Sequence, residues 1–160
     1  MAKKKGKKTD LSDPPAIFNR RAKFDYHIDD TLECGIELLG TEVKQLRLGQ
    51  AQMADAYARI DRGQLYLHGI HIDPYQHAGE LANHEPRRVR RLLAHRREIT
   101  KLDDATRERG VTLVPLRIYF KEGRAKVEVG VARGKRTVDK RQDLKAKAAE
   151  RDIRRAMARR

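Results

Sequence analysis

The stretch VTLVPLRIYFKEGRAKVEVGVA, residues 111–132, predicts a β-hairpin. In residues 125–132 valines alternate with small or polar residues, which is the two-residue period of a half-buried strand. Residues 111–120 alternate in a similar way, and EGR at 122–124 supplies the turn between them. Pro115 has no backbone N–H to donate, so it predicts an edge strand or a bulge in the first half of the hairpin.

Further strands are expected upstream of this hairpin. Apolar and polar residues alternate in residues 22–29, which predicts a strand with one buried face, and residues 32–39 predict a second strand. Residues 55–60 and 64–72 flank the turn DRG and predict another hairpin. The alternation changes phase at Gly69, which indicates a bulge or a sharp bend at that position.

Two regions between the strands carry the apolar spacing of helices. Residues 41–49 predict a helix of two or three turns, with Thr41 as its N-cap. Residues 89–109 carry an apolar stripe at helical spacing and predict one interrupted helix or two short ones. About six short strands with inserted helices favour a mainly β fold, a small closed or nearly closed antiparallel barrel with about three helices.

The composition fits one domain. A chain of 160 residues with 39% hydrophobic content can build one modest core. The single cysteine, Cys34, cannot form an internal disulfide, and no apolar run reaches the length of a signal segment or a membrane span. We therefore expect a reduced, cytoplasmic protein that does not associate with membranes.

The net charge of +14 lies almost entirely near the two ends of the chain. Residues 1–8 carry +5 and residues 133–160 carry +8, whereas the rest of the chain carries only +1. Basic segments on a nearly neutral body are typical of proteins that bind polyanions, because each phosphate contact releases condensed counterions. Nucleic acid is therefore the expected class of partner.

Three segments are expected: a disordered basic arm over residues 1–15, a folded body over residues 16–132 and a basic tail over residues 133–160. The second part of the tail, residues 142–160, can form a helix, but its apolar face is too thin to hold it on the body. The residues on that face are Ala146, Ala149, Ile153, Ala156 and Met157. We expect the tail to be disordered alone and to fold on its partner; the alternative is a solubilising tail without specific structure.

Candidate catalytic and metal-binding groups are few. His68, His71 and Asp73 have the side chains of a metal site, but in a strand His68 and His71 point to opposite faces. Glu33 and the acids at 29–30 are more typical of an acid-rich turn than of an acid–base site. The sequence contains no glycine-rich phosphate loop and no nucleophile motif. We expect a protein that is not an enzyme and that uses no cofactor and no metal.

The most basic stretch of the body is RRVRRLLAHRR, residues 87–97. As a helix it would dock its apolar face on the barrel and offer its arginines to phosphates or exposed bases, with Arg90 and Arg91 as candidate contacts. The alternative is a solvated helix face whose charges are paired with nearby glutamates. Residues 19–23, NRRAK, add a second basic edge.

Four separate stretches lie in the order and spacing of a known family. They are NRRAKFDYHI (19–28), GTEVKQLRLGQA (40–51), RRLLAHRREI (90–99) and GVARGKRTVDKR (130–141). Together they resemble SmpB, the family of SsrA-binding proteins of bacterial trans-translation. The likeness is collinear from about residue 19 to residue 141 and extends loosely through the rest of the tail.

This resemblance implies an OB-like barrel that binds the tRNA-like domain of tmRNA (SsrA RNA). The complex, charged with alanine and carrying elongation factor Tu, would be delivered to ribosomes stalled without a codon in the A site. The tail would lie against 16S rRNA in the decoding centre and fold as a helix in the vacant mRNA channel. The resemblance also suggests a protein that acts as a monomer.

Particular residues match the family's functional positions. Those implied to face tmRNA are Arg20, Tyr26, Glu33, Leu93, His95 and Lys126. Those implied to act in the decoding-centre tail are Arg133, Gly134, Lys135, Arg136, Asp139, Lys140, Arg141 and Met157. Without the resemblance, the residues are equally compatible with a ribosomal or ribosome-assembly protein that binds rRNA, and an RNA-modifying enzyme is a second rival.

Overall fold

The computed structural model of the chain describes residues 14–158, so most of the predicted N-terminal arm, residues 1–13, lies outside the described residues. Within that range the strands are β1 (Ile17–Phe18), β2 (Tyr26–Ile36), β3 (Ala51–Gln52), β4 (Tyr57–Asp61), β5 (Gln64–His68), β6 (His71–Ile72), β7 (Arg90–Leu93), β8 (Val111–Lys121) and β9 (Arg124–Gly134). The helices are α1 (Ala22–Asp25), α2 (Gly40–Arg47), α3 (Arg96–Thr106) and α4 (Thr137–Ala158), with a 3-10 turn at Glu80–Ala82. None of these helices combines the length and the apolar composition needed to cross a bilayer.

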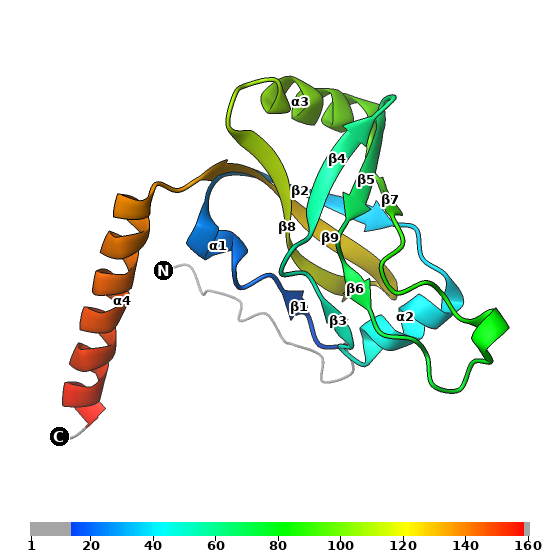
Figure 1. Cartoon of the computed structure of the whole chain (residues 1–160), viewed down its shortest axis with the longest axis horizontal. Coiled ribbons are helices and arrows are strands. Elements are labelled where there is room, and N and C mark those ends of the chain that lie inside the picture. Colours follow the sequence, from blue (N-terminus) through cyan, green and yellow to red (C-terminus); the bar gives the residue numbers. More distant parts are fainter. Residues whose placement is uncertain (1–13, 159–160) are drawn as a thin grey trace, which may run out of the picture.

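The main sheet closes into a ring (Figure 1). In the described chain, six strands follow one another in the order β8-β4-β5-β7-β2-β9, and β9 pairs back onto β8. Every pairing is antiparallel; β1 adds to β8 outside the ring, and β3 pairs with β6 in a separate small sheet. The prediction of a mainly β, closed antiparallel fold is confirmed. Helix α3 lies over one end of the ring and α2 near the other (Figure 1).

The β8–β9 hairpin forms as predicted, with Lys121 opposite Arg124 at its turn. The register shifts between Pro115 and Arg117, which confirms the predicted bulge and gives the proline a place where no ladder donor is needed. On β9, Val127 and Val129 are fully buried, whereas Glu128 between them is half-buried on the outer side.

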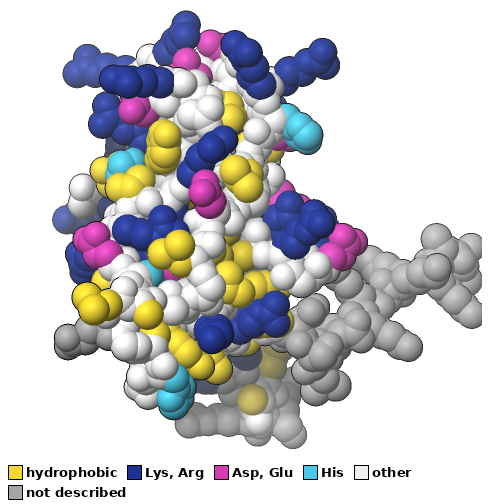
Figure 2. Space-filling view, turned by 90° about the vertical axis from the view of Figure 1, so that its right-hand side faces the viewer, with side chains coloured by type: hydrophobic (Ala, Val, Ile, Leu, Met, Phe, Trp, Pro, Cys, Tyr) yellow, Lys and Arg dark blue, Asp and Glu magenta, His cyan; other side chains and the backbone are white. Residues whose placement is uncertain are grey.

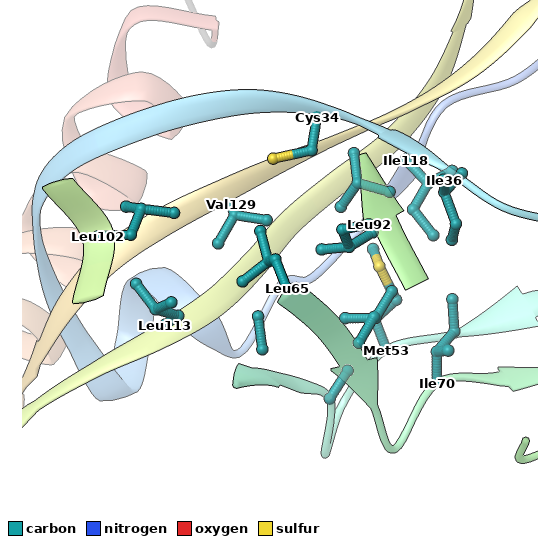
Figure 3. Packing of buried hydrophobic residues seen from close by; sticks show 14 of the residues in the cluster. Cys34, Ile36, Met53, Leu65, Ile70, Leu92, Leu102, Leu113, Ile118 and Val129 are labelled. Carbon is teal, nitrogen blue, oxygen red and sulfur yellow. The ribbon is translucent and has the colours of Figure 1, made fainter. Parts of the chain in front are cut away.

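Side chains from all parts of the ring fill its interior. Figure 3 shows Leu65, Leu92, Leu113 and Val129 pointing toward one another, with Cys34 beside them. Each of these five residues is at most 1% exposed, and burying a leucine of this kind stabilises the fold by roughly 1.5–3 kcal/mol relative to leaving it in water. Because the interior is occupied by apolar side chains, the functional surface must lie outside the ring.

The two strands predicted at 22–29 and 32–39 are wrong in their boundaries. Residues Ala22–Asp25 form the short helix α1, and one continuous strand, β2, follows it. The Asn19 side chain accepts a hydrogen bond from the Ala22 N–H at 3.2 Å and donates one to the Pro115 carbonyl at 3.0 Å, which holds the turn that precedes α1. Tertiary contacts of this kind override a short alternating pattern.

The hairpin of β4 and β5 is confirmed, and so is the bend after it. Gly69 has a φ of 73°, and a Cβ at this position would lie 2.6 Å from the Asp55 carbonyl oxygen. Only glycine allows this approach without displacing the backbone. The chain therefore leaves the main sheet at Gly69 and continues into β6, which pairs with β3.

Helix α2 is confirmed, but Thr41 does not cap it. The N-cap is Leu39, whose N–H donates to the Glu42 carboxylate at 2.7 Å. Thr41 lies in the first turn instead, and its hydroxyl is 2.9 Å from Nδ1 of the buried His84. This contact attaches the loop before β7 to α2.

The helix predicted over residues 89–109 is wrong in its first part. Residues Arg90–Leu93 form strand β7, and helix α3 begins only at Arg96. The adjacent Leu92 and Leu93 satisfy a helical stripe in the sequence, but in the structure Leu92 enters the core while Leu93 faces solvent. Arg90 points inward although it is charged. The sequence of this segment therefore does not show the alternation of apolar and polar residues that is typical of a strand.

Arg90 is buried because Glu42 accompanies it. Glu42 and Arg90 are both fully buried, and Glu42 Oε1 accepts hydrogen bonds from Arg90 Nε at 2.9 Å and from Arg88 Nε at 2.8 Å. Arg90 also donates to the carbonyl oxygens of Ile70, Arg88 and Pro86. Burial by itself would raise the pKa of Glu42, but the hydrogen bonds from Arg88 and Leu39 and the charge of Arg90 outweigh it and lower the pKa. The cluster ties α2 to β7.

Replacing Glu42 with alanine is expected to destabilise the fold by about 3–5 kcal/mol, because it leaves the Arg90 guanidinium buried without its counter-charge. The measurement is the free energy of unfolding from denaturant titration. Glu37→Ala, which removes an exposed carboxylate near Arg88, should change the free energy of unfolding by less than about 0.5 kcal/mol. Equal effects of the two substitutions would show that Glu42 does not stabilise the fold as the counter-charge of Arg90.

Candidate nucleic-acid interface

Three predicted site residues meet on the outer face of the ring. Leu93 of β7 lies opposite Gly35 of β2, Gly35 lies opposite Lys126 of β9, and Lys126 lies opposite Tyr119 of β8. Glu33 lies two residues from Gly35 on the same side of β2. We call this the Glu33 surface; its members are Glu33, Leu93, Tyr119, Lys121 and Lys126.

The Glu33 carboxylate is held by its neighbours. The Tyr119 hydroxyl donates a hydrogen bond to Glu33 Oε2, and Lys121 Nζ lies 3.2 Å from Oε1. The hydrogen bond from Tyr119, followed by that from Lys121, lowers the pKa of Glu33. Desolvation and the same hydrogen bond raise the pKa of Tyr119 to about 12. At neutral pH the surface therefore presents an oriented carboxylate, a protonated phenol and two lysines, a set that can pair with ribose hydroxyls, bases and phosphates.

Leu93 and His95 border this surface. Leu93 is 48% exposed, and a Cβ placed on Gly35 would lie 3.3 Å from the Leu93 Cβ, so the glycine gives this side chain room to lie across β2. His95 is exposed at the N-cap of α3, where its N–H donates to the Glu98 carboxylate at 2.8 Å. Both side chains are accessible to a partner.

The two arginines predicted to bind phosphate have different surroundings. Arg90 is fully buried with Glu42, so its prediction as a phosphate contact is wrong. Arg91 is exposed on the outside of β7, opposite Tyr66 of β5. Successive side chains of a strand point to opposite faces, so of these two neighbouring arginines one lies in the core and the other on the surface.

Arg20 and Tyr26 lie away from the Glu33 surface. Arg20 is exposed just before α1, and Tyr26 is half-buried at the start of β2. Tyr26 and Glu33 are seven positions apart along β2, which corresponds to roughly 23 Å. Tyr26 pairs with Gly134 at the end of β9, beside the base of the tail, and Arg20 lies two residues before α1.

The tail is attached to the body at α1. We call residues 135–143 the tail root. Lys135 donates its backbone N–H to the Asp25 carbonyl at 2.9 Å and its Nζ to Asp143 at 2.5 Å, while Lys140 Nζ lies 2.8 Å from the Asp25 carboxylate. The hydrogen bond from Lys140 lowers the pKa of Asp25, and the hydrogen bond from Lys135 lowers that of Asp143. Asp139 also lies 3.7 Å from Nε2 of His27.

The predicted start of the tail at residue 133 is two residues too early. Arg133 and Gly134 are the last residues of β9 and pair with His27 and Tyr26 of β2. The Arg133 guanidinium donates to Asp29 at 2.7 Å and to Glu108 at 2.8 Å. A phosphate at Arg133 would therefore have to replace carboxylates that already occupy its donors.

Helix α4 begins five residues before the predicted helix and contains no buried residue. Figure 1 shows it projecting away from the ring, with α1 near its first turn. Val138, Leu144, Ile153 and Met157 are all at least 49% exposed. The expectation that the tail is disordered alone stays a prediction.

The other candidate sites do not assemble. The His68 ring stacks on Tyr57 with centroids 5.0 Å apart, whereas His71 lies 3.1 Å from Asp73. Between residues 14 and 158, no group of three or more His, Cys, Asp or Glu side chains is placed to hold a metal ion. Glu33, Asp29 and Asp30 each pair with a different basic residue instead of forming an acidic cluster.

Comparison with known proteins identifies the family. The family model described as SmpB protein matches residues 16–159. The chain belongs to the SmpB family.

Two relatives of this SmpB-family chain are similar to it over almost their whole length. It is 53% identical to an SsrA-binding protein of Thermobifida fusca, with 100% of this chain and 99% of the relative covered, and 52% identical to one of Salinispora tropica, with 100% and 96% covered. A solved structure described as "tmRNA-SmpB: a journey to the center of the bacterial ribosome" superposes with a TM-score of 0.65 at 49% identity. That alignment covers 77% of this chain and 86% of the other.

Sequence reasoning missed three residues of this SmpB-family protein that take part in these sites. Tyr119 and Lys121 complete the Glu33 surface, and Asp25 holds the tail root. The signal for Tyr119 was available, because a turn at residues 122–124 places it opposite Lys126. Asp25 had no such signal, since its partner Lys140 lies 115 residues away.

Replacing Asp25 with asparagine is expected to loosen the tail root in the free SmpB-family protein. Losing one partly exposed ion pair should accelerate amide hydrogen exchange at Lys135 and Lys140 roughly two- to fivefold. Asp152→Asn, which changes an exposed acid farther along α4, serves as the control and should leave these rates unchanged. Identical exchange rates in both variants and the parent protein would show that the Asp25 contact does not hold the tail.

Proposed function

We propose that this protein binds tmRNA and acts with it on stalled ribosomes in trans-translation. The observation that carries the proposal is membership of the SmpB family over residues 16–159, together with relatives named as SsrA-binding proteins and a structural neighbour described as tmRNA-SmpB in the ribosome. A net charge of +14 suits an RNA partner. These observations favour tmRNA over the alternative of an rRNA-binding ribosomal or assembly protein.

The Glu33 surface is the proposed contact with the tRNA-like domain of tmRNA. Its carboxylate can accept hydrogen bonds from a base edge or a ribose hydroxyl, while Lys126 and Lys121 lie within reach of flanking phosphates. Leu93 offers an exposed apolar side chain next to them, and His95 extends the surface toward α3. Arg20 and Tyr26, which lie near the tail root, would contact RNA as it passes toward the tail.

The tail is the proposed contact with 16S rRNA in the decoding centre and with the vacant mRNA channel. Arg136 and Arg141 are exposed, whereas Lys135, Asp139 and Lys140 contact the body. On the ribosome, phosphates would take the place of Asp25 and Asp143 as partners of these lysines. Met157 would supply an apolar contact near the end of the helix.

The remaining features of the proposal concern partners and location. Elongation factor Tu would join through alanyl-tmRNA, and the protein would act as a cytoplasmic monomer. It would work by binding alone, without catalysing a reaction and without a cofactor.

Replacing Glu33 with glutamine is expected to weaken binding to the tRNA-like domain about tenfold, because a charge-assisted acceptor is lost. The salt dependence of binding should stay unchanged, since no cation is removed, whereas Lys126→Gln should lower its log–log slope by about 0.9. The measurement is a binding titration at several salt concentrations, with a 16S rRNA hairpin of equal length for comparison. Glu122→Gln, in the exposed β8–β9 turn, is the control. Unchanged affinity in both surface variants would rule out this contact.

Deleting residues 135–160 should separate the two roles of the protein. Among the described residues 135–158, the deletion removes none that is buried. The thermal transition should therefore stay almost unchanged, and most of the affinity for the tRNA-like domain should remain. Tagging of stalled peptides in a reconstituted translation system should stop, because nothing would occupy the decoding centre. Normal tagging by the truncated protein would make the tail a solubilising segment and refute its proposed role.

A further inference from the structure

Aromatic and basic side chains lie in register on the side of the ring formed by β4, β5 and β7. Arg59 of β4 lies opposite Tyr66 of β5, and Tyr66 lies opposite Arg91 of β7. Tyr57 of β4 lies opposite His68 of β5, two residues along the same strands. The residues that alternate with them on each strand point inward, so these five side chains share the outer surface. We call them the β4–β5–β7 face.

The rings of this face are arranged to accept a further flat group. Tyr57 and His68 stack with their planes only 6° apart, and Tyr57 is 46% exposed. A shallow groove of about 290 Å³ runs beside them, lined by Arg59, Asp61, Tyr66, His68 and Val89. A groove of this size and openness suits one or two flat groups better than an enclosed ligand.

Among the described residues, the two arginines of this face are not paired with carboxylates. In the part of the chain that the structure describes, neither Arg59 nor Arg91 forms an ion pair or a side-chain hydrogen bond, whereas Arg117 and Arg133 on β8 and β9 are paired with carboxylates. Asp61 is the acid that lines the groove, beside Arg59, and the second arginine of the face, Arg91, lies opposite Tyr66 on β7. Figure 2, which views the molecule from the right-hand side of Figure 1, shows basic side chains interleaved with apolar, histidine and some acidic side chains.

We propose that the β4–β5–β7 face is a second RNA-binding surface, which takes unpaired nucleotides. Bases would stack on the rings of Tyr57, Tyr66 and His68, and Arg59 and Arg91 would bind the flanking phosphates. Bases inside a duplex have no free face to stack, so the surface discriminates single strands from duplexes. An acidic peptide would meet the arginines but leave the rings unused.

This inference goes beyond the proposed function. The tRNA-like domain is assigned to the Glu33 surface, which is centred on β2 and β9, across the ring from β4 and β5. The two surfaces adjoin at β7, where Arg91 and Leu93 face outward. On the other side of the ring, β4 pairs with β8 at Leu113, six residues along β8 from Tyr119. One protein can therefore hold a structured RNA on one side and an unpaired strand on the other.

The test uses the full-length protein and a fluorescent single-stranded RNA of about 12 nucleotides, with a duplex of the same sequence for comparison. The double variant Tyr57→Thr/Tyr66→Thr keeps the strand propensity of both positions and removes the two rings. Its binding to the single strand should weaken about tenfold, and its binding to the duplex should change by less than about twofold. Arg59→Gln should lower the salt slope of single-strand binding by about 0.7. Arg151→Gln, on the exposed tail helix, removes the same charge elsewhere and should affect single strand and duplex alike.

A second measurement locates the contact. Photocross-linking of the single strand carrying 5-iodouridine, followed by mass spectrometry, should label Tyr57, Tyr66 or His68. Labelling confined to residues 133–160, or equal competition by oligoglutamate and RNA, would make the face a non-specific cationic surface and overturn the proposal. If the tyrosine double variant also lost binding to the tRNA-like domain, this face and the Glu33 surface would form one site, and the proposal of a second site would be wrong. Glu33→Gln distinguishes the two proposals, because it should weaken binding to the tRNA-like domain and leave single-strand binding unchanged.

Discussion

The pairing of β8 with β9 is the interaction on which the rest of the structure depends, because it closes the ring. Two strands of eleven residues each form a ladder that returns the sheet to its starting strand, and β2 adds a third long strand on the other side of β9. Closure leaves the inner face to apolar side chains and removes edges from six strands. Recognition is consequently confined to the outer face and to the segment that leaves the end of β9.

The buried Glu42–Arg90 pair explains how a strongly basic stretch can be part of a core. Removing two charges from water is costly, and it is tolerated here because Glu42 accepts four hydrogen bonds and Arg90 donates to three carbonyl groups as well. The pair holds α2, the loop before β7 and β7 in one arrangement. Leu93 and Arg91 depend on that arrangement, since they reach the outer face only when Arg90 and Leu92 point inward.

The tail differs from the body in what holds it. Helix α4 has no buried residue, and its contacts with the body are polar and concentrated in residues 135–143. Ion pairs at exposed positions contribute little to stability and exchange readily for other charged partners. A polyanionic partner such as ribosomal RNA can therefore replace Asp25 without disturbing the ring.

The sequence by itself determined the mainly β fold, the two hairpins, the bulge at Pro115, the bend at Gly69 and the separation of a nearly neutral body from basic ends. These features are local, because alternation, turn residues and charge can be read within a few residues. Only the tertiary structure decided that Arg90 is buried while Arg91 is exposed, and that residues 22–25 are helical. Each of these depends on a partner many residues away, Glu42 for Arg90 and Pro115 for Asn19. A local pattern carries no information about a partner that only folding brings into contact.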